Sequence, residues 1–131
     1  MPPFVVEKID HVSVLITDLE RSARFYGETL GLKPIHSPLT FDFKVLWFDL
    51  GGQHLHLLLK PQADTASPRH FALRVDDAAK ARAYFQNLGI ATQETTIIHG
   101  ADRFFLSDPD GNRIEIIEWQ RPYSSDENTP K

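Results

Sequence analysis

The sequence contains no cysteine, no dense run of Lys or Arg, and no long apolar stretch. The lack of cysteine excludes disulfides, thiolate catalysis and cysteine-ligated metal sites. The formal net charge of −4 argues against nucleic acid as a partner, because phosphates are bound by basic surfaces. No apolar run approaches the roughly 20 residues that span a bilayer, and the first ten residues lack the pattern of a signal peptide. We therefore expect a cytoplasmic protein that binds neither nucleic acid nor membranes.

What the sequence does contain is typical of one globular domain. Its 131 residues are 41% hydrophobic and 24% charged, which is enough chain and apolar content for a hydrophobic core. The last dozen residues, 120–131, are polar and include two prolines. We expect a domain over residues 1–119 followed by a flexible tail over residues 120–131.

The chain also repeats itself. The stretch "HVSVLITDLERSARFYGETLGL" from His11 resembles "HFALRVDDAAKARAYFQNLGI" from His70, at an offset of 59 residues. The same offset places "DLGGQHLHL" from Asp49 over "DPDGNRIEI" from Asp108. Two blocks with one offset indicate two copies of one module. We place module one at about 8–60, a linker at 61–68, and module two at about 69–119.

Each module is predicted to be β-α-β-β-β, which makes the fold class α+β. Alternating apolar residues predict the strands, and Asp18 and Asp77 are suitable N-caps for one helix in each module. One face of the strands is apolar and should carry the two helices. The predicted strands are 9–16, 32–36, 43–50 and 53–59, then 70–75, 91–94, 102–107 and 113–119, with helices over 19–30 and 77–88.

The opposite face of the strands carries an unusual set of polar side chains. A period of two places the following residues there: His11, His54, His56, His70, Arg74, Arg113 and Glu115. Neutral imidazole and carboxylate are ligands for Zn, Ni, Co, Mn and Fe. A lone strand histidine is usually a surface residue, but these histidines stand at repeat-related positions. The repeat matches His11 with His70 and His56 with Glu115, so we expect these four side chains to include metal ligands.

Three stretches, "IDHVSVLITDLERSARFYGETLGL", "RHFALRV" and "DPDGNRIEIIEW", resemble the vicinal oxygen chelate superfamily. That superfamily includes glyoxalase I, methylmalonyl-CoA epimerase, extradiol dioxygenases, fosfomycin-modifying transferases and bleomycin-resistance proteins. The resemblance implies two tandem βαβββ modules that form a cupped, eight-stranded mixed sheet around a divalent metal, with helices on the outer face. It also implies a homodimer, in which the metal site lies within one chain or is shared between two.

The resemblance further implies four metal ligands, which are His11, His56, His70 and Glu115. In glyoxalase I the position of His56 holds a glutamate that doubles as the catalytic base, and in the epimerase it holds glutamine. A histidine there departs from both, although imidazole can ligate a metal or act as a base. We therefore take His56 and Glu115 as the catalytic candidates.

Further side chains are candidates for contact with a substrate. His54 is expected to shape the pocket beside His56, and Arg74 and Arg113 could meet a substrate carboxylate. Trp47 and Phe104 could line an aromatic pocket, although aromatic residues in strands are more often core.

The leading hypothesis is a metal-dependent, glyoxalase I-like lyase or isomerase that binds two neighbouring oxygens of a small substrate, with a thiol such as glutathione as a potential cosubstrate. One alternative is an extradiol-type dioxygenase, in which His11, His70 and Glu115 hold Fe(II) and His56 acts as an acid–base residue. The other is a non-catalytic, resistance-type protein that only binds a small molecule.

Overall fold

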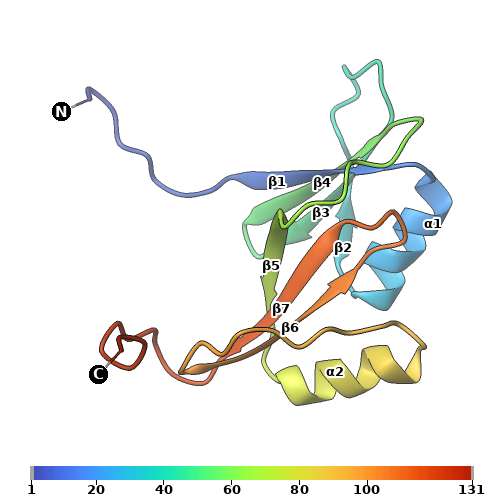
Figure 1. Ribbon diagram of the computed structural model, residues 1–131. Helices are drawn as coiled ribbons and strands as arrows, with labels where there is room; N and C mark the ends of the chain where they lie inside the picture. The colour runs from blue at the N-terminus through green and yellow to red at the C-terminus, as the bar shows by residue number, and fades with distance from the viewer. Residues whose placement is uncertain (1, 131) are drawn as a thin grey trace. The chain divides into compact units, whose positions relative to one another are not determined.

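The computed structural model describes residues 2–130 and has an α+β fold (Figure 1). The chain separates into two compact units, with the boundary between Thr65 and Ala66. Unit one contains β1 (His11–Ile16), α1 (Leu19–Ala23), η1 (Arg24–Thr29), β2 (Lys33–Ile35), β3 (Val45–Leu50) and β4 (Gln53–Leu59). Unit two contains β5 (His70–Arg74), α2 (Ala78–Asn87), β6 (Ala101–Ser107) and β7 (Arg113–Trp119).

Each unit is built around one mixed sheet. The sheet of unit one has the order β1-β4-β3-β2, and that of unit two has the order β5-β7-β6. In each, the first and last strands of the unit are parallel and the other pairs are antiparallel. No helix within residues 2–130 has the length and apolar character needed to cross a membrane.

The parallel strand pairs have the same register in both units, 59 residues apart. The matched pairs are His11–His54 with His70–Arg113, Val12–Leu55 with Phe71–Ile114, and Ser13–His56 with Ala72–Glu115. The internal repeat therefore extends from sequence to strand pairing. Because side chains alternate along a strand, the same positions in both units face the same side of the sheet.

The predicted apolar face is confirmed as the face that carries the core. Leu55, Leu57 and Ile114 are fully buried on it. The helix of unit one packs Tyr26 against this face, with its ring 6.1 Å from that of Phe48. The polar side chains of β1, β4, β5 and β7 are thereby left on the opposite face of each sheet.

The helix predicted over 19–30 is divided into α1 and a π-helical segment, η1. Asp18 caps α1 as expected, since its carboxylate accepts a hydrogen bond from the Arg21 amide at 2.9 Å. In η1 the Leu30 amide donates to the Phe25 carbonyl, five residues back, at 2.9 Å. This wider turn buries two consecutive aromatic residues, Phe25 and Tyr26. Single π-helical turns are often found at functional sites.

The expected eighth strand, over 91–94, is absent from the part of the chain that the structure describes. Gln93 forms a single bridge with Phe105, through two backbone hydrogen bonds of 2.8 Å. After this bridge Glu94 turns to Arg82 of α2, whose Nε donates to it at 2.9 Å. The ladder therefore ends after one pair.

The polar C-terminal segment makes hydrogen bonds to the turn before β6. The side-chain amide of Asn128 accepts from the His99 amide at 2.8 Å and donates to the Ser124 carbonyl at 2.9 Å. Arg121 pairs with Glu127. Residues 120–130 therefore fold back on the turn before β6, while most of their side chains stay exposed.

The turn between β6 and β7 depends on the buried carboxylate of Asp108. This carboxylate accepts hydrogen bonds from the Asp110 amide at 2.9 Å and from the amide and side chain of Asn112, both at 2.8 Å. We predict that Asp108→Ala lowers the free energy of unfolding by about 1–3 kcal/mol, because partly buried backbone donors lose their acceptor. Urea denaturation measures the change. Asp108→Asn, which keeps one acceptor oxygen, should lose less, and a wild-type midpoint for Asp108→Ala would contradict the prediction.

Candidate functional site

In unit one the side chains of His11 and His56 meet on the polar face of the sheet. Their rings stack with centroids 4.2 Å apart and planes 26° apart. On the other side of His56, Trp47 of β3 stacks on the same imidazole at 3.7 Å, with planes 9° apart. Because β4 lies between β1 and β3, the His56 ring is held between the rings of His11 and Trp47. Only 8% of His56 remains exposed.

The electrostatics of this pair keep imidazole nitrogens available for a ligand. Burial, reinforced by the nearby His11 and His54, lowers the pKa of His56 to about 4, so the ring is neutral at pH 7. Its Nε2 is buried and has no hydrogen-bond partner among the described residues. His11 Nδ1 lies 2.9 Å from a carboxylate oxygen of Asp10. Since that oxygen only accepts, Nδ1 carries a proton, and in the neutral ring Nε2 of His11 has the lone pair.

In unit two the corresponding pair is His70 and Glu115. His70 Nε2 lies 3.0 Å from Glu115 Oε1, and its Nδ1 lies 2.9 Å from the Pro68 carbonyl oxygen. The carbonyl only accepts, so Nδ1 carries a proton. Nε2 and Oε1 therefore face each other as two electron-pair donors, an arrangement that requires a proton or a cation between them. Glu115 is 6% exposed.

Arg103 and Phe105 of β6 complete the surroundings of Glu115, and neither was identified from the sequence. Arg103 Nη1 lies 3.5 Å from Glu115 Oε2, and its Nη2 donates to the Thr96 carbonyl at 2.7 Å. Phe105 is opposite Glu115 in the ladder. The Phe105 ring meets the edge of His70 at 4.8 Å and carries the Arg113 guanidinium 3.8 Å above its centroid.

The hairpin in each unit determines which aromatic residue lies beside the site. In unit one Asp49 pairs with His54, whereas in unit two Ser107 pairs with Arg113, which leaves one more residue in the turn. Because of this extra residue, positions of β6 that are 59 residues after positions of β3 point to the opposite face of the sheet. The counterpart of Trp47 is therefore Phe105, at an offset of 58 and not 59.

Phe104, a candidate from the sequence for an aromatic pocket, lies on the helix side of the sheet of unit two. Phe104 is fully buried. Its ring lies 6.2 Å from that of Phe85 and 4.8 Å from the Arg82 guanidinium, and both of these residues belong to α2. Side chains alternate between the two faces along β6, so Phe104 faces the helix while Phe105 faces the side of Glu115. Phe104 is a core residue.

The other predicted substrate-contacting residues lie on the polar faces. His54 is half-buried, with its ring 5.6 Å from those of both Trp47 and His56. Arg113 lies over Phe105, on the face that carries Glu115. Arg74 is exposed at the end of β5, in register with Ile117.

No group of three or more His, Asp or Glu side chains within residues 2–130 is gathered so as to hold a metal ion. The pairs that are present consist of imidazole and carboxylate, which are ligand types for divalent cations. Each unit supplies a pair. His11 and His70 both have Nδ1 bound to an oxygen acceptor, which is how metal-ligating histidines are commonly oriented. In unit two His70 Nε2 and Glu115 Oε1 lie 3.0 Å apart, at hydrogen-bond distance, and these are the two atoms that would hold a cation there.

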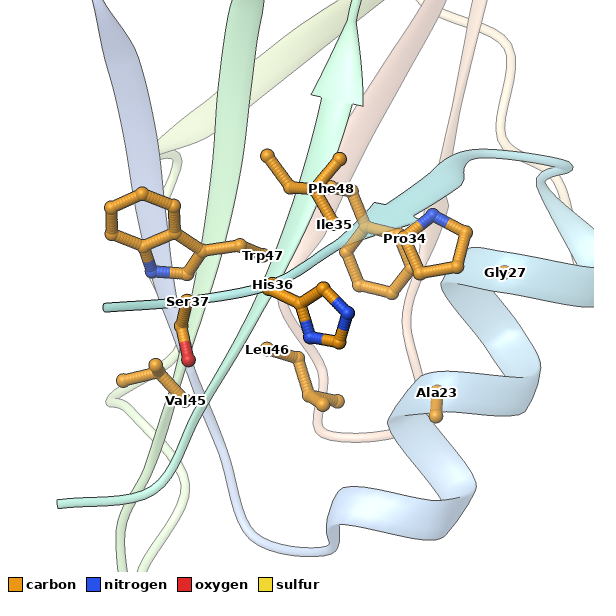
Figure 2. A pocket seen from close by; sticks show the side chains of 10 residues that line it. All are labelled: Ala23, Gly27, Pro34, Ile35, His36, Ser37, Val45, Leu46, Trp47 and Phe48. Atoms are coloured by element: carbon orange, nitrogen blue, oxygen red, sulfur yellow. The ribbon is translucent and has the colours of Figure 1, made fainter. Parts of the chain in front are cut away.

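A pocket of about 310 Å³ lies at the β2 edge of unit one (Figure 2). α1 and η1 contribute Ala23 and Gly27 to its wall, β2 and the residues after it contribute 34–37, and β3 contributes 45–48. Trp47 is thus shared between the pocket and the stack on His56.

Comparison with known proteins is consistent with this architecture. A family model described as Glyoxalase/Bleomycin resistance protein/Dioxygenase superfamily matches residues 8–116. A lactoylglutathione lyase of Escherichia coli O157:H7 is 31% identical, over 82% of this chain and 90% of that protein. Glyoxylase I 4 of Arabidopsis thaliana is 28% identical, over 87% and 72%. The crystal structure of a glyoxalase family protein from Bacillus anthracis has a TM-score of 0.82 and 30% identity, over 89% and 98%.

Proposed function

The chain belongs to the Glyoxalase/Bleomycin resistance protein/Dioxygenase superfamily, and from this we propose that it is a metal-dependent, glyoxalase I-like lyase or isomerase acting on a small substrate with two neighbouring oxygens. The observation that carries the proposal is the repeated donor pair. Two units with one strand register place a histidine and a second donor diagonally across parallel strands. Among the relatives, the name lactoylglutathione lyase describes a lyase with a thiol-derived substrate.

We assign His11, His56, His70 and Glu115 as the ligands of one divalent ion, which is Ni, Zn, Co, Mn or Fe. His11 and His56 belong to unit one, and His70 and Glu115 belong to unit two. When bound, the ion supplies a Lewis acid that stabilises negative charge on the substrate oxygens. Asp10 and the Pro68 carbonyl hold the two first-strand imidazoles through Nδ1, so that Nε2 of each is the nitrogen that would coordinate.

His56 and Glu115 are the groups that can move a proton. The neutral His56 imidazole can accept one at a ring nitrogen, and the Glu115 carboxylate can accept one at Oε2, next to Arg103. The stack of Trp47 and His11 holds the His56 ring in one orientation and shields it from water. Arg113 and Arg74, on the polar face of unit two, are the side chains that would meet a carboxylate of a thiol cosubstrate such as glutathione.

The proposal predicts isomerisation of the adduct that glutathione forms with a 2-oxoaldehyde, once the metal is supplied. His56→Ala should lower kcat/KM by about 1000-fold, because it removes a ligand and a proton acceptor together. The matched control is His99→Ala, since His99 is exposed and distant from both pairs in the sequence. Equal turnover in wild type and His56→Ala would refute the assignment of this residue.

A dioxygenase is the second candidate, and one observation favours it. His11 and His70 both have Nδ1 held by an oxygen acceptor, and with Glu115 they form the two-histidine, one-carboxylate set of Fe(II) oxygenases. The protein reconstituted with Fe(II) under anaerobic conditions would then consume O₂ with a catechol. Such uptake without isomerase activity would replace the first proposal with the second.

A further inference from the structure

We propose that Arg103 is a positioning residue that makes Glu115 a one-oxygen ligand, and that it thereby sets which divalent ions the site prefers. Arg103 holds Oε2 of Glu115 and leaves Oε1, beside His70, for the cation. The inference rests on the proposed function in one respect, which is that Glu115 binds a divalent ion. It does not depend on the reaction that follows.

The two carboxylate oxygens of Glu115 lie in different surroundings. Oε1 faces Nε2 of His70 at 3.0 Å, whereas Oε2 faces Nη1 of Arg103 at 3.5 Å. Because Nδ1 of His70 is bound to the Pro68 carbonyl oxygen, Nε2 of the neutral ring presents a lone pair toward Oε1. Two electron-pair donors therefore meet at Oε1, where a cation is needed, while a positive charge already lies at Oε2.

The guanidinium of Arg103 is fixed on the side away from Glu115. Its Nη2 donates a hydrogen bond to the Thr96 carbonyl at 2.7 Å, and its central carbon lies 5.9 Å from the centroid of the Phe105 ring. Only 15% of the Arg103 side chain is exposed, and 9% of that of Glu115. Charges that are largely removed from water are weakly screened. A divalent ion that also approached Oε2 would be repelled by this guanidinium, so the carboxylate is expected to bind through Oε1 alone.

The repeat provides an internal comparison. Arg103 is opposite Ile117 in the ladder of unit two. Val45 is opposite Leu58 in the corresponding ladder of unit one. Leu58 and Ile117 are equivalent in the two parallel strand pairs, so Val45 occupies the place of Arg103. The ligand candidate on the last strand of unit one is His56, whose neutral ring offers a single nitrogen lone pair. The guanidinium thus lies in the unit whose candidate has two donor oxygens, where it can withhold one of them.

The number of oxygens that Glu115 contributes decides which ions fit the assigned ligands. With one oxygen, the set consists of that atom and the imidazole nitrogens of His11, His56 and His70, which is the four-ligand composition typical of Zn²⁺. A second oxygen from the same carboxylate would favour Mn²⁺, which prefers oxygen-rich, octahedral sites. We therefore expect Arg103 to bias the site toward Zn²⁺ and against Mn²⁺.

The test compares the Kd of Zn²⁺ with the Kd of Mn²⁺ in the full chain, by competition with a chelating dye. We expect Arg103→Met to lower the ratio of the Mn²⁺ Kd to the Zn²⁺ Kd by about tenfold, within the range found for residues that orient ligands. The ratio cancels the gain in affinity for every cation that follows from the lost charge. Arg103→Lys keeps a positive charge near Oε2 without the planar fork that also binds Thr96, and its ratio should stay near that of wild type.

The matched control is Arg113→Met. The Arg113 guanidinium lies 3.8 Å from the centroid of the same Phe105 ring, but it forms no ion pair with Glu115 within residues 2–130. Its removal takes one positive charge from the same face of the sheet and should leave the ratio of the two Kd values at the wild-type level.

A second readout, infrared spectroscopy, can be made on wild type itself. The asymmetric and symmetric stretches of a carboxylate are farther apart when one oxygen binds a metal than when both do. In the difference spectrum between the Zn²⁺-loaded and the metal-free protein, Glu115→Gln identifies the bands of Glu115 by removing them. We expect these bands to be widely separated in wild type and closer together in Arg103→Met.

The outcomes separate this inference from the proposed function. Metal binding with the expected ratio and band separation, but without isomerase activity, would leave the assignment of Arg103 in place and remove the proposed reaction. Closely spaced bands in wild type, an unchanged ratio in Arg103→Met, or the same ratio in Arg103→Lys as in Arg103→Met would overturn the assignment of Arg103 alone. The absence of saturable binding of either ion to wild type would overturn both.

Discussion

Glu115→Gln is expected to weaken divalent metal binding by at least about 100-fold and to lower kcat/KM by about 1000-fold, since even residues that only orient ligands contribute 10–100-fold. Glutamine has the shape of glutamate but lacks its charge. In the native chain Oε1 faces His70 Nε2 at 3.0 Å and Oε2 faces Arg103 at 3.5 Å. The variant replaces the carboxylate with a weak neutral donor, and Arg103 loses its counter-charge. Competition with a chelating dye measures the affinity.

The control for this substitution is Glu118→Gln on the same strand. Glu118 accepts a hydrogen bond from the Ala78 amide at the start of α2, at 2.9 Å, so it lies on the helix side of β7. An amide oxygen can keep that bond, and metal affinity should match wild type. Wild-type affinity in Glu115→Gln, with the fold intact by circular dichroism, would show that Glu115 is not a ligand.

Phe104→Ala is expected to lower the free energy of unfolding by about 3–5 kcal/mol, which is typical of a phenylalanine removed from a packed core. Phe104 is fully buried between the sheet of unit two and α2, where Phe85 and Arg82 contact its ring. The substitution leaves a cavity on the side of the sheet away from Glu115. Chemical denaturation measures the loss, and KM for any substrate should stay near the wild-type value.

Phe43→Ala is the contrasting variant. Phe43 is 52% exposed in the loop before β3, so its removal should change stability by no more than about 0.5 kcal/mol. A small stability loss for Phe104→Ala together with a large rise in KM would instead restore Phe104 as a substrate contact.

The outcome for Phe104 shows what the sequence could and could not predict. Alternation along β1, β4, β5 and β7 was sufficient to place His11, His56, His70 and Glu115 on one face of their strands, because these strands follow the repeat without a shift. The face of β6 could not be assigned in this way. It depends on the length of the following turn, where one additional residue moves Phe105 to the site and Phe104 to the core.

The same register explains why Arg103 was missed. Arg103 is two residues from Phe105 on β6, so both side chains lie on the same face of the sheet as Glu115. Only the observed pairing of Phe105 with Glu115 reveals which face this is. Two other differences come from contacts that the residue pattern did not indicate, one of them within a helix and the other between a helix and a loop. Leu30 bonds to Phe25 in the wider turn of η1, and Arg82 binds Glu94 where a strand was expected.

The most direct test of the account is the metal content of the purified full chain after reconstitution, measured by elemental analysis alongside His56→Ala. We expect about one equivalent of divalent metal per chain, bound tightly by wild type and weakly by the variant, because unit one offers two imidazoles and unit two offers an imidazole and a carboxylate. The absence of saturable metal binding in the wild-type protein would contradict it.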